Sequence, residues 1–160
     1  PGPALDVGTG LGDTAEELAR RGFTVVAFDV APSAIAQARS RFPTSRVTYE
    51  VADLLAPPAH YAGRFDLIVE CYTLQVLPAP VRAHAVAALR RLLAPGGTLL
   101  VIARGREPDE PEGAMPWPLT RAEIEAIGGD GLTLRRFEDF HDDERPRVRR
   151  FRASFLRARA

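Results

Sequence analysis

The chain is 160 residues long, with 46% hydrophobic and 26% charged residues, the balance of one soluble globular domain. Its 21 basic residues are all arginine and oppose 21 acidic residues, which excludes a global positive field that recruits nucleic acid or an anionic membrane. A single cysteine excludes an intrachain disulfide framework and a cysteine-based zinc site, and no apolar run is long enough to cross a membrane. A cytoplasmic protein is therefore expected.

Apolar runs alternate with helical patterns, which predicts parallel strands joined by crossover helices. Strands are expected over residues 4–7, 23–28, 47–51, 65–69 and 98–103, and helices over 13–21, 32–42 and 81–93. Asp13 or Thr14 is expected to cap the first helix, and Pro95-Gly96-Gly97 to end the helix over 81–93.

The last third of the chain has a different pattern. Residues 104–118 are rich in Pro, Gly and acids and predict a loop. Thr120-Arg121-Ala122-Glu123 has the form of a capping box and predicts a short helix that ends at Ile127. Partial alternation of polar and apolar residues over 132–140 and 148–156 predicts a terminal antiparallel hairpin.

A glycine-rich turn, Asp6-Val7-Gly8-Thr9-Gly10-Leu11-Gly12, follows the first expected strand. Ligands of open α/β sheets bind beyond the carboxyl ends of the strands, and glycines there let the backbone approach a ligand. The dinucleotide fingerprint is G-x-G-x-x-G, whereas this turn reads G-x-G-x-G with an acid two residues before it. The spacing disfavours an NAD-dependent oxidoreductase, which is the weakest alternative.

Five motifs in order resemble the class I S-adenosylmethionine-dependent methyltransferases. They are the turn over residues 5–12 and the segments 25–29, 51–54, 65–69 and 92–101. The resemblance covers nearly the whole chain. It implies an α/β, Rossmann-like, doubly wound fold with a mostly parallel seven-stranded sheet and an antiparallel terminal hairpin strand. It also implies S-adenosylmethionine as cofactor and transfer of its methyl group to a small-molecule acceptor.

The resemblance implies roles for the residues at the strand ends. Asp29 is expected to accept both ribose hydroxyl hydrogens, with Val30 against the adenine. Asp53 is expected to accept from the adenine amine while the Leu54 N–H donates to a ring nitrogen. The residues expected at the cofactor are Asp6, Gly8, Thr9, Gly10, Gly12, Asp29, Val30, Asp53, Leu54 and Glu70.

Each acid also has a purely structural interpretation. Asp6 can be a helix N-terminal carboxylate, Asp29 a helix cap, and Asp53 a turn residue. Cys71 is interpreted as a small apolar filler, because no base accompanies it in the sequence.

The acceptor is expected to contact the segment after the fourth strand and the loop after the fifth. Tyr72, Gln75 and Trp117 are the substrate candidates, with core packing as the alternative for Tyr72 and a helix start as that for Gln75. No catalytic residue is assigned, because a base is needed only for a protonated acceptor. The acids of the loop 105–118 favour a cationic acceptor.

Other partners are not expected. His60, His84 and His141 are far apart in the sequence, and no metal site is predicted. The arginines over 145–159 alternate with apolar residues and follow a run of acids, so solvated strand positions are favoured over RNA binding. Neither a nucleic-acid nor a membrane partner is predicted, and the oligomeric state is left open.

One departure from the family concerns the start of the chain. Family members usually carry helices before the first strand, whereas this chain begins directly with an apolar run. Residues 1–160 are therefore expected to form a single methyltransferase domain that could lack N-terminal cap helices. The alternative from another class is a non-catalytic S-adenosylmethionine-binding or partner subunit of a methylation complex.

Overall fold

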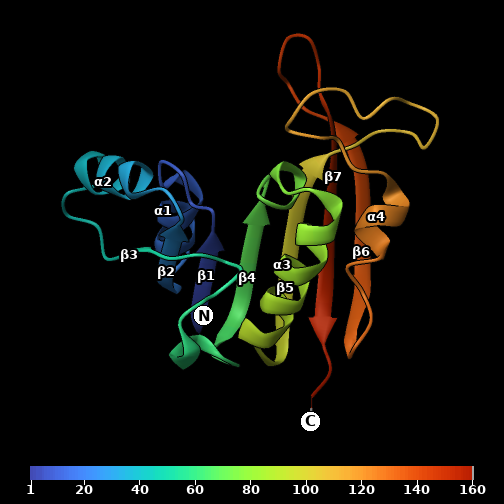
Figure 1. Cartoon of the computed structure of the whole chain (residues 1–160). Helices are drawn as coiled ribbons and strands as arrows, with labels where there is room; N and C mark the ends of the chain where they lie inside the picture. Colours follow the sequence, from blue (N-terminus) through green and yellow to red (C-terminus); the bar gives the residue numbers. More distant parts are fainter. Residues whose placement is uncertain (160) are drawn as a thin grey trace.

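The computed structural model describes residues 1–159 and is built on a seven-stranded sheet in the order β3-β2-β1-β4-β5-β7-β6 (Figure 1). The strands are β1 (Pro3–Val7), β2 (Thr24–Asp29), β3 (Thr48–Val51), β4 (Phe65–Cys71), β5 (Leu93–Arg104), β6 (Leu132–His141) and β7 (Arg149–Arg157). The helices are α1 (Asp13–Arg20), α2 (Pro32–Arg41), α3 (Ala79–Leu92) and α4 (Arg121–Glu125), with 3-10 turns η1 (Ala59–Tyr61) and η2 (Leu74–Val76).

The first five strands pair in parallel, and β7 runs antiparallel to both of its neighbours, β5 and β6. The predicted Rossmann-like sheet with an antiparallel last strand is confirmed. The chain builds outward from β1 to β3 and then returns to place β4 on the other side of β1. This reversal of strand order opens a crevice at the carboxyl ends of β1 and β4, where ligands of such sheets bind.

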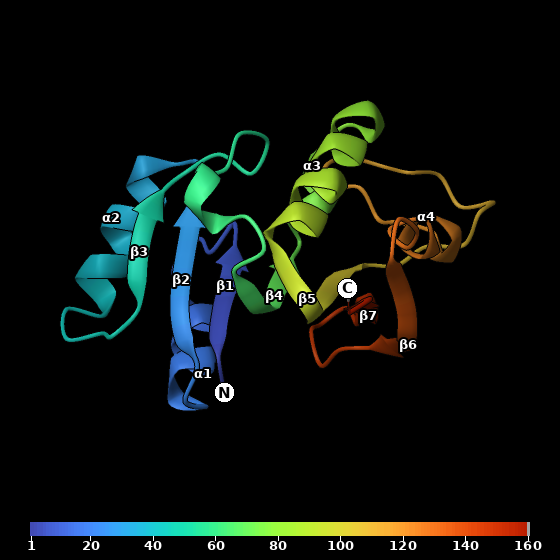
Figure 2. The same ribbon diagram turned by 90° about the horizontal axis from the view of Figure 1, so that it is seen from below.

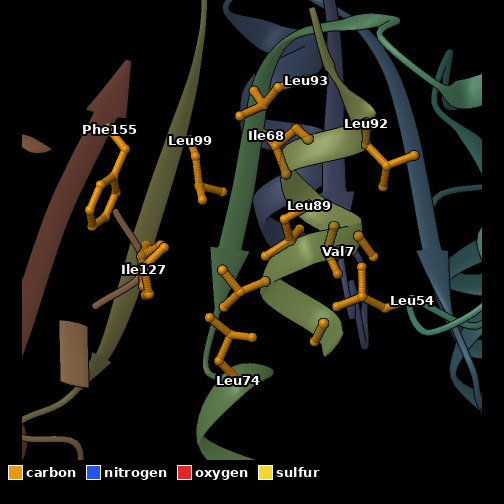
Figure 3. Packing of buried hydrophobic residues seen from close by; sticks show 14 of the residues in the cluster. Val7, Leu54, Ile68, Leu74, Leu89, Leu92, Leu93, Leu99, Ile127 and Phe155 are labelled. Carbon is orange, nitrogen blue, oxygen red and sulfur yellow. The ribbon is translucent and has the colours of Figure 1, made fainter. Parts of the chain in front are cut away.

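Helices cover both faces of the sheet, and each face has its own apolar cluster. Alternate residues of β1 point to opposite faces, so that Leu5 and Val7 join one cluster and Ala4 the other. The first cluster packs against α3 and α4, with Leu89 and Leu92 over the centre of the sheet (Figure 3). The second lies under α1 and α2, and Figure 2 shows α1 and α3 on opposite sides.

Two boundary predictions are wrong. Helix α3 ends at Leu92 and β5 begins at Leu93, so Pro95-Gly96-Gly97 lies inside a strand and does not end the helix. The pairing register with β4 shifts at this point, between Phe65 and Leu67. Such an irregularity accommodates a proline, which has no N–H to donate to the ladder.

The cap of α1 is the second correction. Gly12 is the N-cap residue, and no side chain caps the helix. Asp13 instead pairs with Arg41 of α2 at 2.8 Å (Nη2 to Oδ1). By contrast, the capping box of Thr120 and Glu123 that begins α4 is confirmed in both directions.

Candidate functional site

A cavity of about 550 Å³ opens at the carboxyl ends of β1, β2 and β4, where the strand order reverses. These ends point to the upper edge of the sheet in Figure 1. Six residues predicted from the sequence line it: Gly8, Asp29, Val30, Asp53, Leu54 and Tyr72. The other predicted residues lie outside its lining: Asp6, Thr9, Gly10, Gly12, Glu70, Gln75 and Trp117.

The glycine turn after β1 forms one wall of the cavity. Gly8, Gly10 and Gly12 all have left-handed backbones, with φ of 63°, 53° and 88°. A Cβ on Gly8 would collide with Oγ1 of Thr73, whereas a Cβ on Gly10 would meet nothing within 4 Å. The segment after β4 therefore presses on the turn at Gly8, where both the backbone and the space require glycine.

Asp29 ends β2 and connects two turns at the cavity wall. Its Oδ2 accepts from the N–H of Gly10 at 3.0 Å, and its Oδ1 accepts from the N–H of Ala31 at 2.9 Å. The N-cap residue of α2 is Ala31, so Asp29 is not the helix cap. A carboxylate oxygen accepts more than one hydrogen bond, and the half-buried Asp29 keeps capacity for a ligand.

The segment after β3 supplies a second carboxylate. Asp53 is exposed, and its Oδ1 accepts from the N–H of Leu55 at 2.8 Å, which fixes a local turn. Leu54, which lies between Asp53 and Leu55 in the chain, is buried. Its N–H donates to none of the backbone carbonyls of residues 1–159. This strand end thus presents a carboxylate and a backbone donor next to each other.

Two buried acids support the cavity from outside its lining. Asp6 is 2% exposed, and its Oδ2 accepts from Oγ1 of Thr9 at 2.6 Å. Glu70 is fully buried, and its Oε1 accepts from the N–H groups of Thr73 and Leu74 at 2.6 and 2.8 Å. Burial raises the pKa of each carboxyl to about 7, because desolvation disfavours the charged form. Through these hydrogen bonds, Asp6 holds the turn after β1 and Glu70 holds the segment after β4, and both segments contribute to the lining of the cavity.

The segment after β4 is held at both ends. Glu70 accepts from its first N–H groups, while Arg82 of α3 donates to the carbonyls of Leu74 and Leu77 at 3.1 and 3.3 Å. Within it, Tyr72 has a left-handed backbone with φ of 66°. A non-glycine residue in this conformation costs about 1–3 kcal/mol, and such strain clusters at functional sites.

Gln75 and Trp117 meet through a backbone hydrogen bond, and both lie outside the lining of the cavity. Gln75 is buried, and its Oε1 accepts from the N–H of Arg104 at 2.7 Å. Its backbone carbonyl accepts from the N–H of Trp117 at 2.9 Å. Gln75 thereby ties the segment after β4 to the end of β5 and to the loop that follows.

Sequence reasoning missed the lining residue Leu55, and it expected the segment after the fourth strand at the site without singling out Thr73, Val76 and Leu77. Cys71, which was expected near the cofactor as an apolar filler, also lines the cavity. Thr73 could be identified only through its contact with Gly8, and that contact depends on the parallel pairing of β1 with β4. Leu55 lies in a loop and Val76 ends the turn η2, and exposed apolar residues gathered at one place, as these two are, mark a ligand site.

Two of the four acids of the loop 105–119 are paired with arginines. Oε1 of Glu112 lies 3.4 Å from Nη2 of Arg106, and Oε1 of Glu107 lies 2.7 Å from Nη1 of Arg149 on β7. Arg106 also donates to the backbone carbonyls of Pro118 and Glu110. These pairs take up part of the acidic charge of the loop, and a cationic acceptor stays a prediction.

Three of the seven arginines over residues 145–159 form ion pairs. Arg149 contacts Asp139 at 2.6 Å, Arg152 contacts Glu138 at 2.6 Å, and Arg150 contacts Asp142 at 2.7 Å. The expected local neutralisation is confirmed for these three, whereas the expected solvated position is wrong for Arg150, which is 6% exposed because its acidic partners let the charge be buried. Within residues 1–159, no group of three His, Cys, Asp or Glu side chains is placed to hold a metal, and no helix is long and apolar enough to cross a membrane.

Comparisons with known proteins agree on one family. A family model described as a methyltransferase domain matches residues 4–97. The 2-heptyl-1-hydroxyquinolin-4(1H)-one methyltransferase of Mycobacteroides abscessus is 32% identical over 129 residues, 79% of this chain and 56% of the relative. The ubiquinone biosynthesis O-methyltransferase of Xanthomonas campestris is 36% identical over 106 residues, 65% of this chain and 44% of the relative.

Solved structures share the fold. The N-methyltransferase NodS from Bradyrhizobium japonicum, in complex with S-adenosyl-L-homocysteine, matches with a TM-score of 0.78 at 23% identity, over 98% of this chain and 78% of that chain. The chain spans about half the length of the curated relatives that it matches.

Proposed function

Because the chain belongs to the class I S-adenosylmethionine-dependent methyltransferase family, we propose that it transfers the methyl group of that cofactor to a small-molecule acceptor. The observation that carries the proposal is the charge of the cavity. Two carboxylates, Asp29 and Asp53, line it, and none of its lining residues is basic. Such a lining suits the ribose hydroxyls and the adenine amine of S-adenosylmethionine, which donate to carboxylates, and its sulfonium cation.

The residues at the strand ends fit the parts of this cofactor. Asp29 accepts from the ribose hydroxyls, and Asp53 accepts from the adenine amine beside the donating Leu54 N–H. Val30, which is exposed at the cavity, lies against the adenine. These roles are supported by the free acceptor capacity of Asp29 and by the N–H of Leu54, which donates to none of the backbone carbonyls of residues 1–159.

The turn after β1 completes the cofactor site. Gly8 brings its backbone to the ligand, while Thr9, Gly10 and Gly12 keep the shape of the turn. Asp6 and Glu70 act on the loops from beneath and not on the ligand.

On the acceptor side of the cavity, the chain aligns the acceptor with the methyl group of the cofactor. When bound, S-adenosylmethionine supplies a methyl group activated by the positive sulfur. Desolvation raises the pKa of the Tyr72 phenol, so the neutral hydroxyl can donate to or accept from the acceptor. Burial raises the pKa of the Cys71 thiol to about 12, so no thiolate forms near neutral pH. The chain thus contributes positioning and exclusion of water, and a base is needed only for an acceptor whose nucleophilic atom arrives protonated.

The proposal extends to the domain organisation, the location and the partners of the protein. Residues 1–160 form one methyltransferase domain, in which Gln75 and Trp117 position the acceptor wall without touching the cofactor. The protein acts in the cytoplasm, which the lone cysteine supports, and takes neither nucleic acid nor membrane as partner, which the paired arginines support.

Transfer of labelled methyl groups tests the function directly. The chain is incubated with methyl-labelled S-adenosylmethionine and a panel of hydroxylated aromatic acceptors, headed by 2-heptyl-1-hydroxyquinolin-4(1H)-one, which the name of the mycobacterial relative gives as its acceptor. Label in at least one acceptor, and loss of that label in Asp29→Asn, is the expected result. Cofactor binding without transfer to any acceptor would favour the non-catalytic subunit.

A further inference from the structure

Arg150 is a buried cation beside the cavity, on a strand that does not line it. It is 6% exposed and lies on β7, in register with Arg104 at the carboxyl end of β5. Strand β4 is the next neighbour of β5, and the N–H of Tyr72 donates to the carbonyl of Ile102 on β5 at 3.0 Å. This register brings the guanidinium carbon of Arg150 to 4.9 Å from the centre of the Tyr72 ring.

Two carboxylates fix the guanidinium in place. Nε donates to Oδ2 of Asp142 at 2.7 Å, and Nη2 donates to Oε1 of Glu144 at 2.6 Å. Oδ1 of Asp142 also accepts from the N–H groups of Glu144 and Val148. Asp142 therefore shapes the tip of the β6–β7 hairpin, residues 142–148, and connects that tip to Arg150.

These ion pairs determine what Arg150 can do. Its charge is already balanced by two carboxylates, which makes it a poor site for a further anion. Its flat face remains available to the aromatic ring, and a cation over a ring is attracted most strongly where water is excluded. The contact is thus a support for Tyr72.

Tyr72 requires such a support. Its backbone is left-handed, it lies after the end of β4, and 38% of the residue is exposed at the cavity. Figure 1 shows the hairpin tip and the loop 105–119 above the same edge of the sheet. The ring is therefore held from the side of β7.

We propose that Arg150 is a positioning residue, which holds the Tyr72 ring at the wall of the cavity and thereby affects which acceptors bind there. The inference rests on the proposed function. It gives β7, far from the cofactor residues in sequence, a role in acceptor selection.

Fluorine NMR tests the contact without any acceptor. The chain has three tyrosines, Tyr49, Tyr61 and Tyr72, and labelling with 3-fluorotyrosine reports on each ring. The Tyr72→Phe variant assigns the Tyr72 resonance. Arg150→Met is expected to shift that resonance, and Arg150→Lys, which keeps the charge, to shift it less.

Arg152→Met is the matched control. Arg152 lies on the same strand, pairs with Glu138 at 2.6 Å and stands 5.3 Å from the ring of Phe140, so the same kind of contact is lost away from the cavity. It is expected to leave the Tyr72 resonance in place. An unmoved resonance in Arg150→Met, or an equal shift in Arg152→Met, would overturn the proposal.

Kinetics then separate positioning from folding. With an acceptor from the panel, Arg150→Met and Tyr72→Leu are each expected to raise the acceptor KM about tenfold, and the double variant no further, because one residue acts through the other. The Kd of S-adenosylhomocysteine should stay unchanged in Arg150→Met. Additive effects would contradict the inference. Failure of the wild type to bind S-adenosylhomocysteine would instead reject the proposed function, while the NMR comparison still tests Arg150.

Discussion

Gly8 and Gly10 lie two residues apart in one turn, with similar left-handed backbones, but only Gly8 has a side chain from elsewhere in the chain against it, that of Thr73 after β4. Gly10→Ala is therefore expected to cost only backbone strain, about 1–2 kcal/mol. Gly8→Ala adds the collision with Thr73 and should be more destabilising in urea unfolding. It should also weaken S-adenosylhomocysteine binding in calorimetry more than Gly10→Ala does. Equal effects of the two variants would show that Thr73 does not constrain the turn.

At the residue scale, the sequence predicts which acids end the strands better than it predicts which way their side chains point. Asp29 and Asp53 line the cavity, as a place directly after a buried strand suggests. Glu70 was expected near the cofactor, yet it is fully buried, because the alternation of β4 turns it to the same face as Val7. The left-handed backbone of Tyr72 carries no sequence signal, since only its contacts impose it.

At the scale of elements, the turn η2 depends on one buried carboxyl. Glu70 has a pKa of about 7 in the folded chain against an ordinary value of 4.5. Between these values the unfolded chain has lost the proton that the folded chain keeps, so the free energy of unfolding falls as the pH rises. One such group gives a slope of about 1.4 kcal/mol per pH unit within that window.

Glu70→Gln tests this dependence. Glutamine keeps a carbonyl oxygen for the N–H groups of Thr73 and Leu74 and does not ionise. Urea unfolding at a series of pH values between about 4.5 and 7 should give a flatter profile for the variant than for the wild type. Asp6, whose pKa is also raised to about 7, remains in both proteins, so the difference between the two slopes is the test. Parallel profiles would contradict the assignment.

Periodicity predicted the seven strands and the helices α1, α2 and α3, and a capping box predicted α4, whereas the 3-10 turns η1 and η2 were not predicted. The errors fell at the ends of elements. The Thr120 capping box was predictable because both partners lie within four residues. The start of β5 was not, because pairing with β4 carries the strand through Pro95-Gly96-Gly97. The cap of α1 also differed, since the remote Arg41 pairs with Asp13.

For the molecule as a whole, the order of motifs predicted the family and the fold, and both are confirmed. Alternation of strands and helices indicates a parallel sheet, and the resemblance supplied the number and direction of its strands. The charge pattern was harder to predict, because the sequence shows an acidic loop and a basic tail, while the fold pairs Arg149 with both Glu107 and Asp139.

This pairing leads to a prediction about nucleic acid. With 21 basic and 21 acidic residues and the hairpin arginines in ion pairs, a labelled single-stranded RNA should show no saturable binding at low salt. Fluorescence anisotropy measures this directly. Binding that weakens steeply with added salt would show that the tail arginines release their carboxylates to phosphate.

The central claim is that the cavity binds S-adenosylmethionine, and calorimetric titration tests it most directly. S-adenosylmethionine and S-adenosylhomocysteine should both bind, NAD should not, and Asp29→Ala should abolish binding of both sulfur ligands. Asp66→Ala is the control, because this exposed acid lies at the opposite end of β4 and should leave binding intact. Binding of NAD with none of either sulfur ligand would contradict the account.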